Sequence, residues 1–157
     1  MSDDLYLSRH FCIVVPSIDT AIEDLGRLVG LEFKPVARMR FTMRRGDVEV
    51  IELLHVSFSI DGLIELVERT AEGAFGRDSG PGLHHIGLVT TRAAEARAEQ
   101  QDSGYEADWR LFNDAGREIA TFYRSGDPGR VPVEIVDVSG RGTDWNDRVA
   151  ASEKLEA

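Results

Sequence analysis

The chain contains one pattern twice, and this internal repeat limits its fold more than any other feature. His10 opens the apolar run Phe11 to Val15, and His85 opens the similar run Ile86 to Thr90. Short, nearly continuous apolar runs of this kind are typical of strands that are buried on both faces. A repeated pattern indicates a repeated structural unit, so the architecture can be predicted before any residue is given a role.

Each run is followed by a segment with helical character. Apolar residues recur at helical spacing from Ile18 to Leu28, with a capping-box pattern at Thr20 to Glu23 and a C-cap at Gly30. The second helix is expected over Ala93 to Asp102, where alanine is frequent, and Gly104 ends it. The two glycines follow their histidines at nearly equal distances, which supports the repeat.

Three strand-like segments follow each helix, separated by turns that contain glycine. They are Phe33 to Met43, Glu49 to Ser59 and Ile64 to Val67, and then Tyr105 to Leu111, Glu118 to Tyr123 and Pro132 to Val138. The sequence therefore predicts an α+β fold in a single domain of two βαβββ modules, at about residues 8–70 and 83–138. A polar tail, 139–157, follows them.

Both modules end in an apolar tetrad that contains a glutamate, Ile64 to Val67 with Glu65 and Val133 to Val136 with Glu134. An unpaired carboxylate in a buried strand is costly, so a cation must neutralise each one. Strand alternation turns each glutamate away from its two apolar neighbours, and it turns His10 and His85 away from the first apolar residue of the run that each one opens.

If these faces of the two modules converge on one cleft, two histidines and two glutamates meet there. Two neutral imidazoles and two carboxylates balance the charge of one divalent ion, which we expect to be Mg, Mn, Co, Ni, Zn or Fe. The expected ligands are His10, Glu65, His85 and Glu134. A lone histidine or glutamate in a strand is more often structural. Here, however, a histidine before an apolar run and a glutamate inside an apolar tetrad occur twice in the same order.

The remaining histidines and the cysteine are assigned structural roles. Alternation places His84 on the opposite strand face from His85, and His55 has no counterpart in the second half. Cys12 would share a strand face with His10, but it is the only cysteine and lies among apolar residues, so we interpret it as a small core residue.

The charge of the chain excludes several classes of partner. The sequence has 18 Lys and Arg against 28 Asp and Glu, a net charge of −10, which would repel nucleic acids and anionic membranes. No apolar run approaches the roughly 20 residues of a membrane-spanning helix. The first residues are acidic, unlike a signal peptide, so a cytoplasmic location is expected.

At these residues the chain resembles the vicinal oxygen chelate superfamily, which includes glyoxalase-like and methylmalonyl-CoA epimerase-like proteins. His10 to Pro16 is similar to that family's first-strand motif, and Gly82 to Gly87 is similar to the epimerase-type opening of its second module. The resemblance covers about residues 8–138 and implies a cup-shaped mixed sheet around a metal, held by the four residues named above. Family members often have a Phe-Tyr pair in the first helix, where this chain has Asp24 to Arg27.

The resemblance implies binding of a small oxygenated substrate through two vicinal oxygens, with the metal stabilising an enolate. The expected activity is that of a metal-dependent isomerase, epimerase or lyase, with anionic and thioester compounds as candidate substrates. Relatives often form homodimers, so a homodimer is expected.

Enolate chemistry requires an acid or base, and two equivalent positions stand out. Glu49 and Glu118 each lie the same number of residues before the glutamate ligand of their module, so they are the expected catalytic pair. The alternative is that both are solvent-facing strand residues. Two other functions stay open: an extradiol-type dioxygenase with Fe(II), and a metal-free binding protein of the drug-resistance type.

Overall fold

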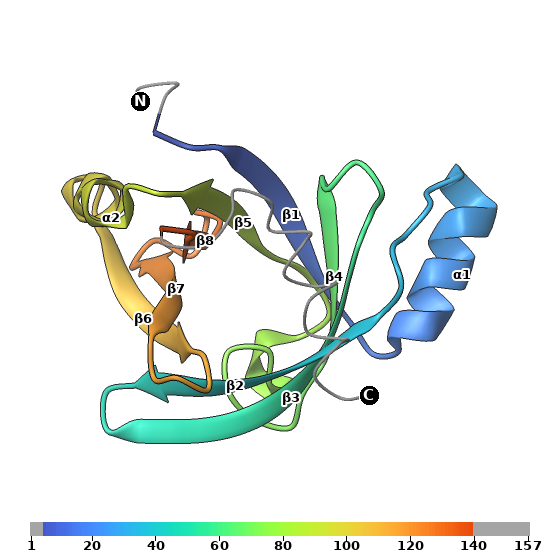
Figure 1. Cartoon of the computed structure of the whole chain (residues 1–157), viewed down its shortest axis with the longest axis horizontal. Helices are drawn as coiled ribbons and strands as arrows, with labels where there is room; N and C mark the ends of the chain where they lie inside the picture. Colours follow the sequence, from blue (N-terminus) through green and yellow to red (C-terminus); the bar gives the residue numbers. More distant parts are fainter. Residues whose placement is uncertain (1–4, 140–157) are drawn as a thin grey trace.

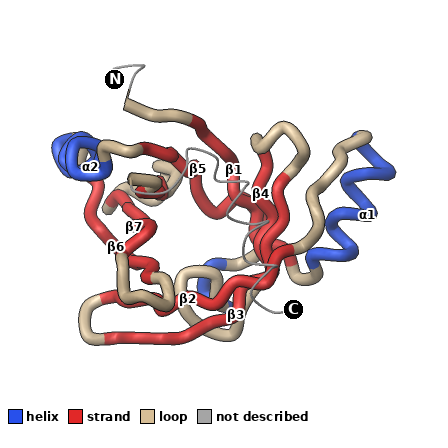
Figure 2. The backbone as a smooth tube through the Cα atoms, viewed as in Figure 1, coloured by secondary structure: helices blue, strands red, loops and turns tan. Residues whose placement is uncertain are grey.

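A computed structural model describes residues 5–139 as one eight-stranded mixed sheet that closes on itself, with two helices outside it (Figures 1 and 2). The first half contains β1 (Ser8–Val15), α1 (Ile18–Val29), β2 (Ala37–Arg45), β3 (Val48–Phe58) and β4 (Ile64–Glu68). The second contains β5 (Gly82–Thr90), α2 (Ala93–Asp102), β6 (Tyr105–Phe112), β7 (Glu118–Ser125) and β8 (Val133–Asp137). A 3-10 turn, η1 (Arg77–Ser79), lies between the halves.

The two halves have the same strand order, β1-β4-β3-β2 and β5-β8-β7-β6. In each half the first and last strands pair in parallel, and the two halves meet through the antiparallel pairs β1–β5 and β2–β6. The predicted α+β fold with a cupped mixed sheet is confirmed. Because β1 and β5 are neighbours, the strands that carry His10 and His85 lie side by side at the junction.

The predicted ends of some elements differ from the structure. The strand expected from Phe33 begins at Ala37, and Phe33 forms only an isolated bridge with Ser59. Pro35 accounts for the late start, because it has no N–H to donate to a neighbouring strand. The predicted polar tail lies, from residue 140 onward, outside the described residues. Within residues 5–139, no helix is long and apolar enough to cross a lipid bilayer.

Helix α1 begins earlier than the expected capping box. Ser17 is the N-cap, with an extended backbone, and its Oγ accepts a hydrogen bond from the N–H of Thr20 at 3.4 Å. Gly30 ends the helix with a φ of 71°, as predicted, and its N–H donates to the carbonyl of Gly26.

We expect Ser17→Ala to lower the free energy of unfolding by about 1 kcal/mol, because it removes the acceptor for an unpaired N–H of the first helical turn. Urea denaturation would measure the change. Thr20→Ala is the matched comparison, since Thr20 is where the sequence pattern placed the cap. A larger loss in Thr20→Ala than in Ser17→Ala would contradict the N-cap in the structure.

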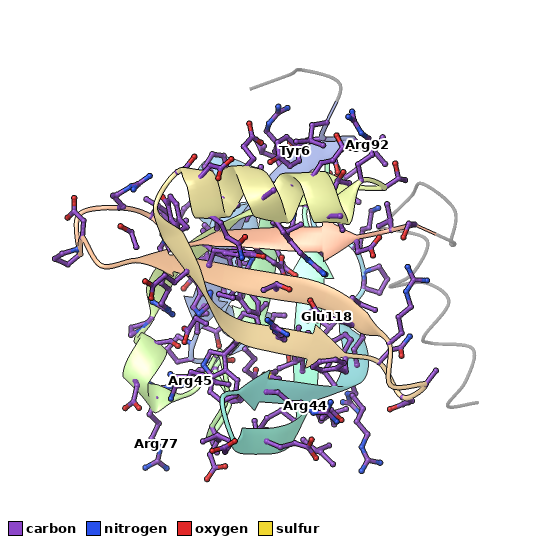
Figure 3. The ribbon with its side chains drawn as sticks, turned by 90° about the vertical axis from the view of Figure 1, so that its left-hand side faces the viewer. Tyr6, Arg44, Arg45, Arg77, Arg92 and Glu118 are labelled. Carbon is purple, nitrogen blue, oxygen red and sulfur yellow. The ribbon has the colours of Figure 1, made fainter. Side chains whose placement is uncertain are left out.

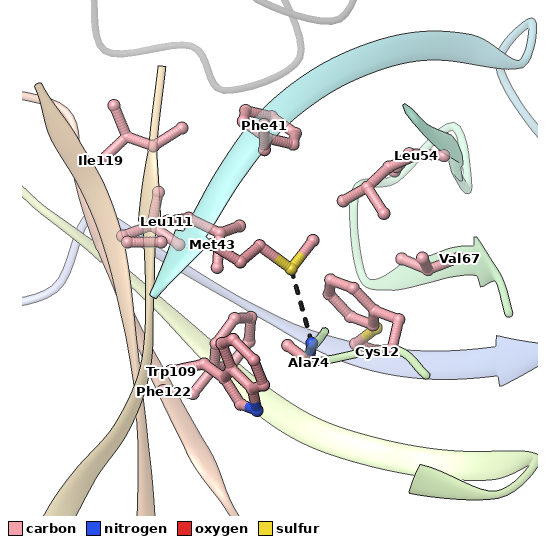
Figure 4. Close-up of a cluster of buried hydrophobic side chains, with 14 of the residues drawn as sticks. Cys12, Phe41, Met43, Leu54, Val67, Ala74, Trp109, Leu111, Ile119 and Phe122 are labelled. Atoms are coloured by element: carbon pink, nitrogen blue, oxygen red, sulfur yellow. Dashed lines mark hydrogen bonds between the residues drawn. The ribbon is translucent and has the colours of Figure 1, made fainter. Parts of the chain in front are cut away.

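The main core lies inside the closed sheet and includes the segment that joins the two halves (Figure 4). Ala74 and Phe75, from this segment, are almost completely buried, and the N–H of Ala74 lies 3.4 Å from Sδ of Met43. Gly73 has a φ of 75°, and a Cβ there would lie 2.8 Å from the same sulfur atom. The linker between β4 and β5 (residues 69–81) is therefore packed into the core at Ala74 and Phe75 and held against β2.

Candidate metal centre

The four predicted ligands converge at the junction of the two modules. They come from four neighbouring strands, β4, β1, β5 and β8, with His10 on β1, Glu65 on β4, His85 on β5 and Glu134 on β8. The parallel pairing within each module brings each glutamate beside the strand that carries its histidine. All four side chains are buried, with between 0 and 6% of each residue exposed. We refer to them as the four-residue cluster.

The donor atoms of the cluster lie close enough to share one ion. Nε2 of His10 is 3.2 Å from Oε2 of Glu65, and Nε2 of His85 is 3.1 Å from Oε2 of Glu134. The two cross distances are 3.5 Å and 3.6 Å. Ligand atoms at about 2.1 Å from one ion are about 3.0 Å apart at right angles and about 3.4 Å apart at the tetrahedral angle. The donor set and its spacing therefore fit one divalent cation.

Within residues 5–139, three of these atoms have no hydrogen-bond partner. They are Nε2 of His10, Nε2 of His85 and Oε2 of Glu65, and all three are inaccessible to solvent. Buried polar atoms without partners are costly, so native proteins rarely leave them unpaired. A cation at the centre of the cluster would satisfy all three atoms.

Without a metal, opposite charges in the cluster shift its pKa values strongly. Burial by itself lowers the pKa of His10, but the carboxylates of Glu65 and Glu134 outweigh it and raise this pKa to about 10. Burial raises the pKa of Glu134, but His85 and His10 outweigh it and lower this pKa to about 2. Burial and the same two carboxylates raise the pKa of Cys12. In the absence of a metal, the two carboxylates thus favour the protonated form of His10.

This arrangement predicts that metal binding at pH 7 to 8 releases about one proton, because His10 must lose its proton to bind. Calorimetric titrations in buffers of different ionisation enthalpy would count the protons. The metal-free protein should lose stability as the pH rises from 6.5 toward 10, since the pKa of His10 is 6.5 when unperturbed and about 10 when folded. The contribution of Glu134 is lost as the pH falls from 4.5 toward 2. Proton-independent metal binding at pH 7 would contradict the prediction.

Gly87 makes room for the ring of His10, a role that the sequence analysis missed. It lies directly opposite His10 in the β1–β5 pair, and a Cβ there would lie 2.0 Å from Cε1 and 2.1 Å from Nε2 of the imidazole. Only glycine fits at this separation. Glycine inside an apolar strand is a known sign of close approach, and this could have drawn attention to the position.

The prediction that His84 faces away from His85 is wrong. The β1–β5 register shifts here, so that Cys12 pairs with His85 but Ile13 pairs with Leu83, and His84 is the extra residue of a bulge. Both rings are therefore buried on the same side, with their Nδ1 atoms 2.8 Å apart. Burial and the neighbouring His85 lower the pKa of His84 to about 4.

The structure does not bring Glu49 and Glu118 to the cluster. Glu49 is on the outer face of β3, half-exposed, and its carboxylate is 2.6 Å from Nε of Arg44. Glu118 pairs with Arg97 of α2 at 2.8 Å, on the side of the sheet that this helix covers (Figure 3). Each carboxylate thus has an arginine partner away from the cluster, and their expected acid–base role rests on the sequence alone.

A profile of the Glyoxalase/Bleomycin resistance protein/Dioxygenase superfamily matches residues 9–122. The chain belongs to this superfamily. The match confirms the resemblance to the vicinal oxygen chelate proteins, and it includes both histidines and the first glutamate of the cluster. Among curated protein sequences, none matches the chain significantly.

Solved structures similar to this superfamily member share its fold at low sequence identity. A hypothetical protein, BH1468 from Bacillus halodurans C-125, is 19% identical with a TM-score of 0.59, and the alignment covers 92% of this chain and 100% of that one. Methylmalonyl-CoA epimerase from Streptomyces coelicolor is 22% identical (TM-score 0.54, coverage 87% and 99%). The epimerase from Mycobacterium tuberculosis is 14% identical (TM-score 0.57, coverage 87% and 91%).

Proposed function

We propose that the protein is a divalent-metal-dependent isomerase or epimerase, or a lyase of the glyoxalase-like type, which binds a small oxygenated substrate through two vicinal oxygens. The observation that carries the proposal is the buried four-residue cluster, in which each histidine Nε2 lies 3.1 to 3.6 Å from Oε2 of both glutamates. Two neutral imidazoles and two carboxylates would cancel the charge of the ion and leave open coordination positions in an octahedral geometry.

A divalent ion held by the cluster would act as a Lewis acid that stabilises negative charge on a substrate oxygen. The protein's own contribution is a rigid, largely apolar surrounding. The ring of Phe58 contacts His10 edge-on at a centroid distance of 5.6 Å, and that of Phe122 contacts His85 at 5.0 Å. These rings hold the two imidazoles in place and lower the local polarity, which strengthens every charge interaction in the site.

Proton transfer requires a base near the substrate, and the cluster itself supplies the nearest carboxylates. Within the described part of the chain, Glu65 and Glu134 are the carboxylates that form a candidate metal group with the histidines. Each directs one oxygen to the centre of the cluster, so each has a second oxygen that can accept a proton. We assign the base to one of these two residues, with Glu49 and Glu118 as the competing pair.

The proposed substrate class is an acyl thioester with an acidic C–H beside its carbonyl. One epimerase structure similar to this chain holds methylmalonyl-CoA, and another, from Streptomyces coelicolor, holds 2-nitronate-propionyl-CoA. At 22% identity these likenesses support only the choice of the first compound to test. A cytoplasmic homodimer is part of the same proposal.

The test is hydrogen exchange at the acidic carbon. The protein is loaded in turn with Mg, Mn, Co, Ni, Zn and Fe(II), and incubated with methylmalonyl-CoA in D₂O, and the loss of the C–H signal is followed by NMR. Metal-dependent exchange above the protein-free rate supports the proposal. Oxygen uptake with Fe(II) would instead favour the dioxygenase, and tight ligand binding without any metal would favour a binding protein.

Four glutamine variants then identify the base. Glu65→Gln and Glu134→Gln keep an oxygen ligand but remove the basic carboxylate, and we expect at least one of them to stop exchange while metal stays bound. Glu49→Gln and Glu118→Gln are the matched comparisons. If exchange stops only in the latter two, the base is the pair that the sequence analysis selected.

A further inference from the structure

A chain of hydrogen bonds leads from the linker to the four-residue cluster. The carbonyl oxygen of Ala74 is 2.8 Å from Nε2 of His84, and Nδ1 of His84 is 2.8 Å from Nδ1 of His85. The other nitrogen of His85, Nε2, faces the two glutamates and has no hydrogen-bond partner among the described residues. The ring of His84 therefore connects a backbone carbonyl to a candidate metal ligand.

The donors and acceptors of these two hydrogen bonds determine which ring nitrogens of His84 and His85 carry a hydrogen. A carbonyl oxygen only accepts, so Nε2 of His84 must carry a hydrogen. A neutral imidazole protonated at Nε2 has its lone pair on Nδ1, so Nδ1 of His85 must donate to it. His85 then has its remaining lone pair on Nε2, as a metal ligand requires.

The alternative is a doubly protonated His84, and its surroundings disfavour it. Only 6% of His84 is exposed, and neither of its nitrogens bonds to a carboxylate in the described part of the chain. A buried imidazolium in this position would have no counter-charge in direct contact.

We propose that His84 is a positioning residue, which holds His85 in the tautomer that presents Nε2 to the metal and fixes the orientation of its ring. This inference rests on the metal site of the proposed function. It makes the linker part of the site, because the carbonyl of Ala74 selects the tautomer of His84 and, through it, that of His85.

The linker is held firmly enough for this role. The carbonyl of Ala74 also accepts a hydrogen bond from Oγ of Ser79 at 2.6 Å. The N–H of Ala74 contacts Sδ of Met43. Gly73, just before Ala74, has a positive φ and packs closely against Met43, which fixes the turn that leads into Ala74. The carbonyl oxygen of Ala74, which accepts the hydrogen bond from His84, therefore has a defined position.

Three substitutions of His84 test the contributions of its two hydrogen bonds separately. His84→Asn places an acceptor oxygen near the position of Nδ1 and removes the donor to the linker. His84→Leu has nearly the same shape as the asparagine variant without the acceptor. His84→Gln can still donate to Ala74 but has no acceptor at the Nδ1 position. His84 borders a cavity of about 310 Å³, so these side chains have room to settle.

The first measurement is the dissociation constant for Zn²⁺, obtained by competition with a chromophoric chelator. We expect His84→Asn to stay within a few-fold of the wild type, and His84→Leu and His84→Gln to lose about 10- to 100-fold in affinity. His55→Leu is the matched control, because His55 pairs with Glu68 away from the cluster and should leave the affinity unchanged. Equal affinities for His84→Leu and wild type would overturn the inference.

The second measurement needs no variant. In the Zn²⁺-loaded wild type, ¹⁵N NMR should place the protons on Nε2 of His84 and Nδ1 of His85, with a scalar coupling between the two Nδ1 atoms across their hydrogen bond. A proton bonded to Nδ1 of His84 would overturn the inference even if every variant failed to fold. A wild type that binds no metal would contradict the proposed function itself, which distinguishes the two failures.

Discussion

Saturating the protein with a divalent ion at about 100 times its dissociation constant should raise the free energy of unfolding by ~2.7 kcal/mol. The reason is that the four-residue cluster exists only in the folded state, so the ion binds the folded chain alone. For a chain of this size the gain corresponds to an increase of roughly 5–10 °C in the melting temperature. Thermal denaturation with metal and with a chelator measures the difference.

Two variants distinguish binding of the ion at the four-residue cluster from stabilisation by metal bound elsewhere on the protein. His85→Ala removes one of the four ligands, so its melting temperature should no longer respond to metal or chelator, and its activity should be lost. His55→Ala should keep the full response, because His55 bonds to Glu68 and is not part of the cluster. A metal response that survives in His85→Ala would show that the ion binds elsewhere, and the metal-free binding protein would become the better account.

Gly87→Ala should strongly disrupt metal binding, although it adds only one heavy atom. The new Cβ would lie 2.0 Å from Cε1 of His10, so the imidazole must leave its position in the cluster. We expect a loss of at least about 100-fold in metal affinity, since a ligand is displaced, and a loss of about 1–3 kcal/mol in stability from overpacking. Chelator competition and urea denaturation measure the two effects.

Gly126→Ala is the matched control for this variant. Its Cβ would meet no atom of the described residues within 4 Å, and its backbone does not have a positive φ, so the substitution should change neither affinity nor stability appreciably. If Gly87→Ala bound metal as tightly as Gly126→Ala, His10 would not be a ligand in the position that the structure gives it.

The convergence of the four-residue cluster could be predicted because each member is conspicuous in its own segment. A glutamate inside an apolar tetrad and a histidine before an apolar run are unusual, and both occur twice in the same order. The equal offsets of Glu49 and Glu118 were a weaker signal, because spacing along the chain does not fix the face of a strand. In the structure, the alternation that turns Val50 toward the core turns Glu49 outward to Arg44.

The sequence by itself determined the repeat, the α+β fold and the four residues that meet at the module junction, because hydrophobic periodicity and out-of-place polar groups are local properties. Only the tertiary structure decided what surrounds them. The pairing of β1 with β5 sets Gly87 against His10, and a one-residue bulge turns His84 toward His85. Register and bulges depend on how two segments about 75 residues apart fit together, so Gly87 by itself can signal a close approach but cannot identify its partner.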